Sequence, residues 1–84
     1  MISALKLKPD EIARFFSTLE PTYRTLINVR LKRIFGRDFY QLASERPDKI
    51  YDFLVRALGE QNTEVFFIMF SRWLINKSND KFIN

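Results

Sequence analysis

The sequence predicts an all-α domain, a compact and dimeric bundle of about four helices. The last of these helices is expected to be central and apolar nearly all round. Three observations favour this fold. Proline or glycine stands at the ends of most predicted helices, apolar residues between these ends recur at helical spacing, and one uninterrupted apolar run extends from Val65 to Phe70. Two glycines and three prolines in 84 residues are too few for a chain rich in loops or β-turns.

The length is that of one domain, residues 1–84. Residues 1–8 are expected to form an N-terminal arm and residues 78–84 a C-terminal tail. The sequence contains no internal repeat, no low-complexity tract and no linker that would divide it.

The first helix is expected from Pro9 to about Leu19, because proline occupies its first position and Asp10 and Glu11 its first turn. The second is expected from about Pro21 to Phe35, ending at Gly36. The apolar stripe of the first helix comprises Ile12, Phe15, Phe16 and Leu19. The apolar face of the second comprises Tyr23, Leu26, Ile27, Leu31, Ile34 and Phe35.

Residues 38–46 are expected to be a connector with room for one helical turn, anchored by Phe39, Tyr40 and Leu42. The third helix is expected to begin at Pro47-Asp48 and to end at Gly59. Its inward residues are Ile50, Phe53, Leu54, Ala57 and Leu58, and its outward residues are Asp48, Lys49, Asp52 and Arg56.

The fourth helix is expected to take Asn62 as its N-cap and to extend to about Lys77. The polar sequence Ser78-Asn79-Asp80 predicts its end, after which Phe82-Ile83 either docks back or frays. A helix that is apolar nearly all round must be surrounded by other elements.

A second copy of the chain is the expected cover for part of this fourth helix. Val65, Met69 and Trp73 are assigned to the second and third helices of the same chain. The side that three short helices do not cover is then predicted to be the interface of a homodimer. The residues assigned to this interface are Phe67, Phe70 and Leu74.

The formal net charge is +4, and its distribution indicates a candidate site for nucleic acid. Five basic residues and no acidic residue lie between Thr22 and Arg37. Either side of the second helix suits a phosphate backbone, although cations also gather at helix C-termini because the helix dipole favours them. The candidate nucleic-acid contacts are Arg30, Arg33, Arg37, Arg24 and Lys32.

Arg30 falls inside the apolar face of the second helix, between Leu26 and Ile34. Such an arginine is expected to reach solvent or to pair with a carboxylate, for which Glu64 and Asp52 are the candidates. The alternative is an arginine that binds a ligand or partner.

The residue types do not favour an enzyme. The chain has no cysteine and no histidine, so thiol chemistry and the most frequent general base and metal ligand are both lacking. Its serines have no histidine to activate them, and its two glycines each end a helix instead of forming a phosphate loop. No catalytic, metal or cofactor residue is expected, and the aromatic residues of the fourth helix are assigned to packing.

A cytoplasmic location is expected. The first eight residues lack the apolar core of a signal peptide, and no apolar run approaches the length of a membrane span.

Several stretches together resemble a small archaeal family of helical output domains, named after its nitrosopumilus members. The resemblance covers about residues 22–77 and implies a compact helical interaction module without catalytic residues. The stretches that carry it are Leu31-Lys32-Arg33-Ile34-Phe35-Gly36, Pro47-Asp48-Lys49-Ile50-Tyr51-Asp52-Phe53-Leu54, Leu58-Gly59-Glu60 and the apolar run that begins at Val65.

The expected function is therefore a non-enzymatic helical module for protein interaction or regulation, similar to a signalling output domain. It is expected to act as a homodimer, and the homodimer is expected to bind a further, unidentified protein. The alternative is a basic dimeric DNA- or RNA-binding protein that uses its second helix.

Overall fold

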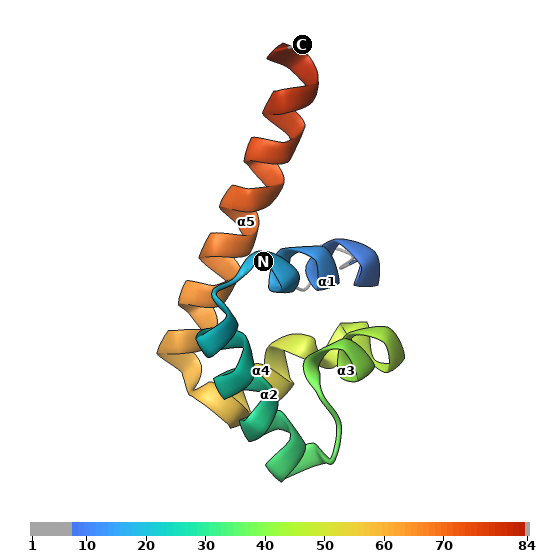
Figure 1. Cartoon of the computed structure of the whole chain (residues 1–84), viewed down its shortest axis with the longest axis vertical. Coiled ribbons are helices and arrows are strands. Elements are labelled where there is room, and N and C mark those ends of the chain that lie inside the picture. Colours follow the sequence, from blue (N-terminus) through green and yellow to red (C-terminus); the bar gives the residue numbers. More distant parts are fainter. Residues whose placement is uncertain (1–7, 84) are drawn as a thin grey trace.

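The computed structural model describes residues 8–83, with side chains placed for residues 8–77, and it is all-helical over this range (Figure 1). Five α-helices and one 3₁₀ turn account for nearly all of it. They are α1 (Pro9–Thr18), α2 (Pro21–Phe35), α3 (Phe39–Glu45), the 3₁₀ turn η2 (Pro47–Lys49), α4 (Ile50–Leu58) and α5 (Glu60–Ile83). The predicted fold class is confirmed, while the helix count is five instead of four.

Helix α5 is the longest element, and the others gather around its first half (Figure 1). Helix α4 packs against α5 and is itself flanked by α2, while α1 contacts both α3 and α5. Helix α4 therefore lies between α2 and α5. The second half of α5 extends past α1, and the molecule measures 43 × 29 × 24 Å.

Proline and glycine set the ends of α1 and α2 as predicted. Pro9 and Pro21 occupy the first turns of these helices. Gly36 ends α2 in the left-handed region, with φ of 76°, and its amide donates to the carbonyl of Lys32. A residue with a β-carbon is strained in this conformation, which is why glycine suits the position.

The expected connector at residues 38–46 is largely a helix, α3, and this corrects the prediction. Asp38 and Gln41 form a capping box in which each side chain accepts a hydrogen bond from the other residue's backbone amide, both at 2.9 Å. The Asn28 side chain accepts a further bond from the Phe39 amide at 2.9 Å, which joins the start of α3 to α2. These three bonds satisfy the amides of Asp38, Phe39 and Gln41 at the start of a helix too short to form alone.

The helix expected from Pro47 divides into the 3₁₀ turn η2 and helix α4. Its predicted faces are confirmed. Ile50, Leu54 and Leu58 are buried, and Phe53 and Ala57 pack against the core. The residues expected to lie outward are all exposed: Asp48, Lys49, Asp52 and Arg56.

Helix α5 is longer at both ends than predicted. It begins at Glu60, because Gly59, with φ of 91°, alone forms the connection from α4. The Gly59 carbonyl accepts the first hydrogen bond of α5, from the Thr63 amide. Asn62 is therefore inside the first turn, and its side chain donates to the carbonyl of Leu58 at 3.0 Å instead of capping the helix. At the other end the backbone remains helical through Ser78 to Ile83. The expected docking or fraying of Phe82-Ile83 concerns side chains beyond residue 77, which the structure does not describe.

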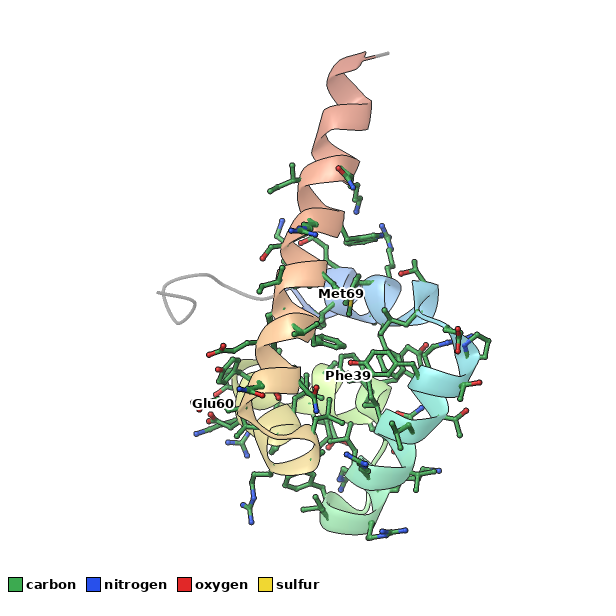
Figure 2. The ribbon with its side chains drawn as sticks, turned by 90° about the vertical axis from the view of Figure 1, so that its left-hand side faces the viewer. Phe39, Glu60 and Met69 are labelled. Carbon is green, nitrogen blue, oxygen red and sulfur yellow. The ribbon has the colours of Figure 1, made fainter. Side chains whose placement is uncertain are left out.

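Aromatic rings from three helices fill the centre of the core (Figure 2). Phe39 of α3 stacks on Phe16 of α1, with ring centroids 4.1 Å apart, and also contacts Phe66 of α5 at 5.8 Å. Phe15 of α1 meets Phe66 edge-on at 5.3 Å. Such edge-to-face and stacked pairs stabilise the core beyond the burial of their surface. Helix α3 is therefore part of the core and not a connector at its surface.

Helix α5 leaves the core at Trp73 and Lys77. The Lys77 ammonium lies over the Trp73 ring, 5.2 Å from its centroid, and 4.0 Å from a carboxylate oxygen of Glu11 on α1. Past this point α5 projects away from the other helices (Figure 1).

Candidate functional site

The residues assigned to a dimer interface belong instead to the core of a single chain. Phe67 and Phe70 are buried, with 5% and 3% of their surface exposed, and Leu74 is half-buried against the same core. Phe67 packs on Tyr51 of α4 and Phe70 on Phe15 of α1. The expectation that Phe67 and Phe70 remain uncovered was wrong, because it counted neither α3 nor the full contribution of α1 to the core.

The exposed side of α5 carries a different set of apolar residues. Val65, Ile68 and Ile75 are more than half exposed, at 51%, 52% and 58%. Val65 was expected to face the chain's own helices, so this placement corrects the prediction. Met69 and Trp73, expected on the same side, do pack partly against the core.

These exposed residues follow one line along the helix, which we call the α5 seam. Positions 65, 68, 72 and 75 are separated by three, four and three residues, the spacing of the contact positions in a coiled coil. This spacing was the signal in the sequence that identifies the seam. The seam is composed of Glu64, Val65, Ile68, Arg72 and Ile75, all of them exposed.

The two charged residues of the α5 seam have no ion-pair partner within residues 8–77, where the ion pairs are Arg37–Glu45 and Lys77–Glu11. Glu64 and Arg72 are eight positions apart, which corresponds to roughly 12 Å along a helix. They are therefore too distant to pair with each other within one chain, and each is available to a partner.

Three of the five expected nucleic-acid contacts donate intramolecular hydrogen bonds, and the two short bonds are those of Arg24 and Arg37. The Arg24 Nε donates to the Leu19 carbonyl at the end of α1, at 2.9 Å. Arg37 lies beyond the glycine that ends α2 and pairs with Glu45 at 2.8 Å. The expected line through Arg30, Arg33 and Arg37 is thus interrupted by Gly36. Arg24 joins α2 to the end of α1, and Arg37 joins the end of α2 to α3.

The other three basic residues of α2, Arg30, Lys32 and Arg33, are exposed. No carboxylate within residues 8–77 pairs with any of them, including Glu64 and Asp52, the partners considered for Arg30. Arg30 instead donates a long hydrogen bond of 3.4 Å to the Ala57 carbonyl. It therefore reaches solvent at the edge of α4, where helical carbonyls favour a cation.

Helix α2 buries a narrower face than predicted. Ile27 and Leu31 are buried, whereas Leu26 and Ile34, expected inside, are 43% and 44% exposed, and Val29 is 47% exposed. The reason is that α2 packs chiefly on α4, a single helix, which covers only one stripe of it.

Two tyrosines have raised pKa values. Burial raises the pKa of Tyr23 above its ordinary value. For Tyr51, partial burial and then the carboxylates of Glu64, Glu60 and Asp52 raise the pKa, because each disfavours the phenolate anion. The hydroxyl of Tyr51 is therefore influenced by two carboxylates of the first turns of α5, Glu60 and Glu64, and by its chain neighbour Asp52 on α4.

No group of three or more acidic, histidine or cysteine side chains gathers within the described residues in a way that suits a metal ion. Within residues 8–83, no helix combines the length and apolar content that crossing a bilayer requires.

The comparisons with known proteins identify no relative: no protein-family model, curated protein or solved structure matches this chain. The candidate surfaces, the α5 seam and the exposed side of α2, therefore follow from the geometry alone.

Proposed function

We propose that the protein is a non-enzymatic helical interaction module, as its resemblance to output domains implies, and that it acts as a homodimer through the α5 seam. The observation that carries this proposal is the line of exposed Val65, Ile68 and Ile75 at coiled-coil spacing. Removing such apolar surface from water is the main favourable contribution to association. This dimer replaces the one expected through Phe67 and Phe70.

The two charges of the α5 seam select the orientation of the helices in the dimer. In an antiparallel pair with a two-fold axis near Ile68, Glu64 faces Arg72 of the partner subunit, and symmetry repeats the pair. In a parallel pair in register, Glu64 would face a second Glu64 and Arg72 a second Arg72, which is repulsive. Opposite charges across an interface fix its register, so the antiparallel dimer is the arrangement that we propose.

Sedimentation velocity over a range of protein concentrations tests this dimer. We expect reversible association with a Kd on the order of micromolar, because a seam of three apolar residues per chain is small. Glu64→Arg and Arg72→Glu should each weaken the dimer by placing like charges together, and the double variant should restore it. Arg14→Glu, which reverses an exposed charge on α1, is the matched control and should not change association.

A wild-type chain that stays monomeric at the highest attainable concentration would contradict the dimer. If the wild type associates but the double variant fails to recover what the single variants lose, the dimer stands and the antiparallel register is wrong.

A further inference from the structure

The exposed side of α2 carries a second surface, separate from the α5 seam. Leu26, Val29, Arg30 and Arg33 stand at positions i, i+3, i+4 and i+7 and therefore share one stripe of the helix. All four are exposed. We call this stripe the α2 ridge: an apolar pair precedes a pair of arginines.

The positive charge of the α2 ridge is not compensated by the chain. Helix α2 contains no acidic residue, and within residues 8–77 neither Arg30 nor Arg33 pairs with a carboxylate. Lys32 adds a further exposed cation on the adjacent side of the helix. A ligand with carboxylates or phosphates thus complements this surface.

The apolar half of the α2 ridge indicates which ligand fits better, one with carboxylates or one with phosphates. Leu26 and Val29 are nearly half exposed, at 43% and 47%, and aliphatic side chains offer nothing to a phosphate backbone. Proteins that bind single strands stack bases on exposed aromatic rings, but the aromatic residues of α2, Tyr23 and Phe35, pack against the core. The combination suits an amphipathic protein segment better than a nucleic acid.

We propose that the α2 ridge docks an acidic amphipathic helix of a protein partner. Apolar side chains of that helix cover Leu26 and Val29, and its carboxylates pair with Arg30 and Arg33, in the manner of helices recognised through anchors at i, i+3, i+4 and i+7. This inference names the partner class of the proposed interaction module, and it does not require the dimer, because the α2 ridge and the α5 seam share no residue.

The test is fluorescence anisotropy with a labelled synthetic peptide, an amphipathic helix with leucines on one face and glutamates beside them. The wild-type chain should bind this peptide. The double variant Arg30→Glu/Arg33→Glu should raise the Kd by about tenfold or more, because like charges across an interface repel. Leu26→Ser should weaken binding as well, through loss of the apolar contact. Both changes are at exposed positions, and circular dichroism should show unchanged helicity.

Two controls separate this site from general electrostatics and from the dimer. Arg14→Glu/Lys49→Glu makes the same change in net charge at exposed positions on α1 and η2 and should leave the Kd unchanged. Ile68→Glu, which should abolish self-association, should still bind the peptide.

Three results with the peptide would overturn the proposal. They are the absence of peptide binding at low salt, an equal loss of binding in the Arg14→Glu/Lys49→Glu control, and peptide binding that Leu26→Ser does not weaken. Tighter binding of a DNA or RNA oligonucleotide than of the peptide, lost in Arg30→Glu/Arg33→Glu, would assign the ridge to nucleic acid instead.

Discussion

The two faces of α5 are both apolar, yet they differ in size, shape and surroundings. The inner face presents the rings of Phe66, Phe67 and Phe70, all buried against α1, α3 and α4. The outer face presents the smaller Val65, Ile68 and Ile75, each more than half exposed. The difference shows that the three phenylalanine rings, which remove much surface from water, are buried within the chain, while the smaller aliphatic side chains stay exposed.

The same substitution at two adjacent positions should give opposite results. Phe67→Glu places a carboxylate in the core without a partner, and this cost is comparable to the whole stability of a small domain. We expect this chain to be unfolded by circular dichroism. Ile68→Glu, at a position that is 52% exposed, should remain folded and sediment as a monomer. A folded Phe67→Glu chain would show that the inner face is not the core.

Truncation to alanine should separate the contributions of the two faces. Phe70→Ala removes a buried ring and should cost about 3–5 kcal/mol in the free energy of unfolding. Ile75→Ala, at an exposed position, should cost at most about 0.5 kcal/mol in dilute solution. Urea unfolding at low protein concentration measures both values.

The concentration dependence of melting makes the comparison sharper. Because a dimer stabilises the folded state by mass action, the wild-type Tm should rise with protein concentration. Ile75→Ala should reduce this rise, whereas Phe70→Ala should lower the Tm at every concentration. A Tm that is independent of concentration in the wild type would show that the outer face does not mediate self-association.

The smallest effect concerns Tyr51, which packs on the inner-face residue Phe67. Because its folded pKa is raised above the ordinary value of about 10, the neutral phenol stabilises the folded state. This stabilisation is complete below pH 10 and is lost as the pH rises through the folded pKa. We expect Tyr51→Phe to unfold less readily above pH 10 than the wild type.

Absorbance of tyrosinate during an alkaline titration measures this effect, and Tyr40→Phe, at an exposed position, is the control. Equal alkaline stability of Tyr51→Phe and the wild type would show that neither burial nor the nearby carboxylates raise the pKa of Tyr51 in the folded chain.

The sequence by itself determined the helical class and most helix boundaries, because proline and glycine act locally. Proline fixes φ and lacks an amide hydrogen, and Gly36 adopts a left-handed conformation, so α2 has the bounds predicted for it. The inward and outward residues of α4 were likewise evident, since its apolar residues occupy a single stripe. Helix α3 was underestimated although its Asp38/Gln41 capping box is a local signal. Its other supports, Asn28 and Phe16, lie on other helices.

Only the tertiary structure decided which side of α5 is buried and which arginines are available. Apolar residues nearly encircle α5, so periodicity alone does not identify its inner face, and the positions of α1, α3 and α4 determine that Phe67 is covered and Ile68 is not. The basic residues between Thr22 and Arg37 look alike in sequence, but Arg24 donates to the Leu19 carbonyl and Arg37 pairs with Glu45, while Arg33 has no such bond within residues 8–77. Burial depends on neighbours distant in the chain, whereas the two arginine bonds reach residues five and eight positions away across the turns that flank α2. Helical periodicity alone describes neither.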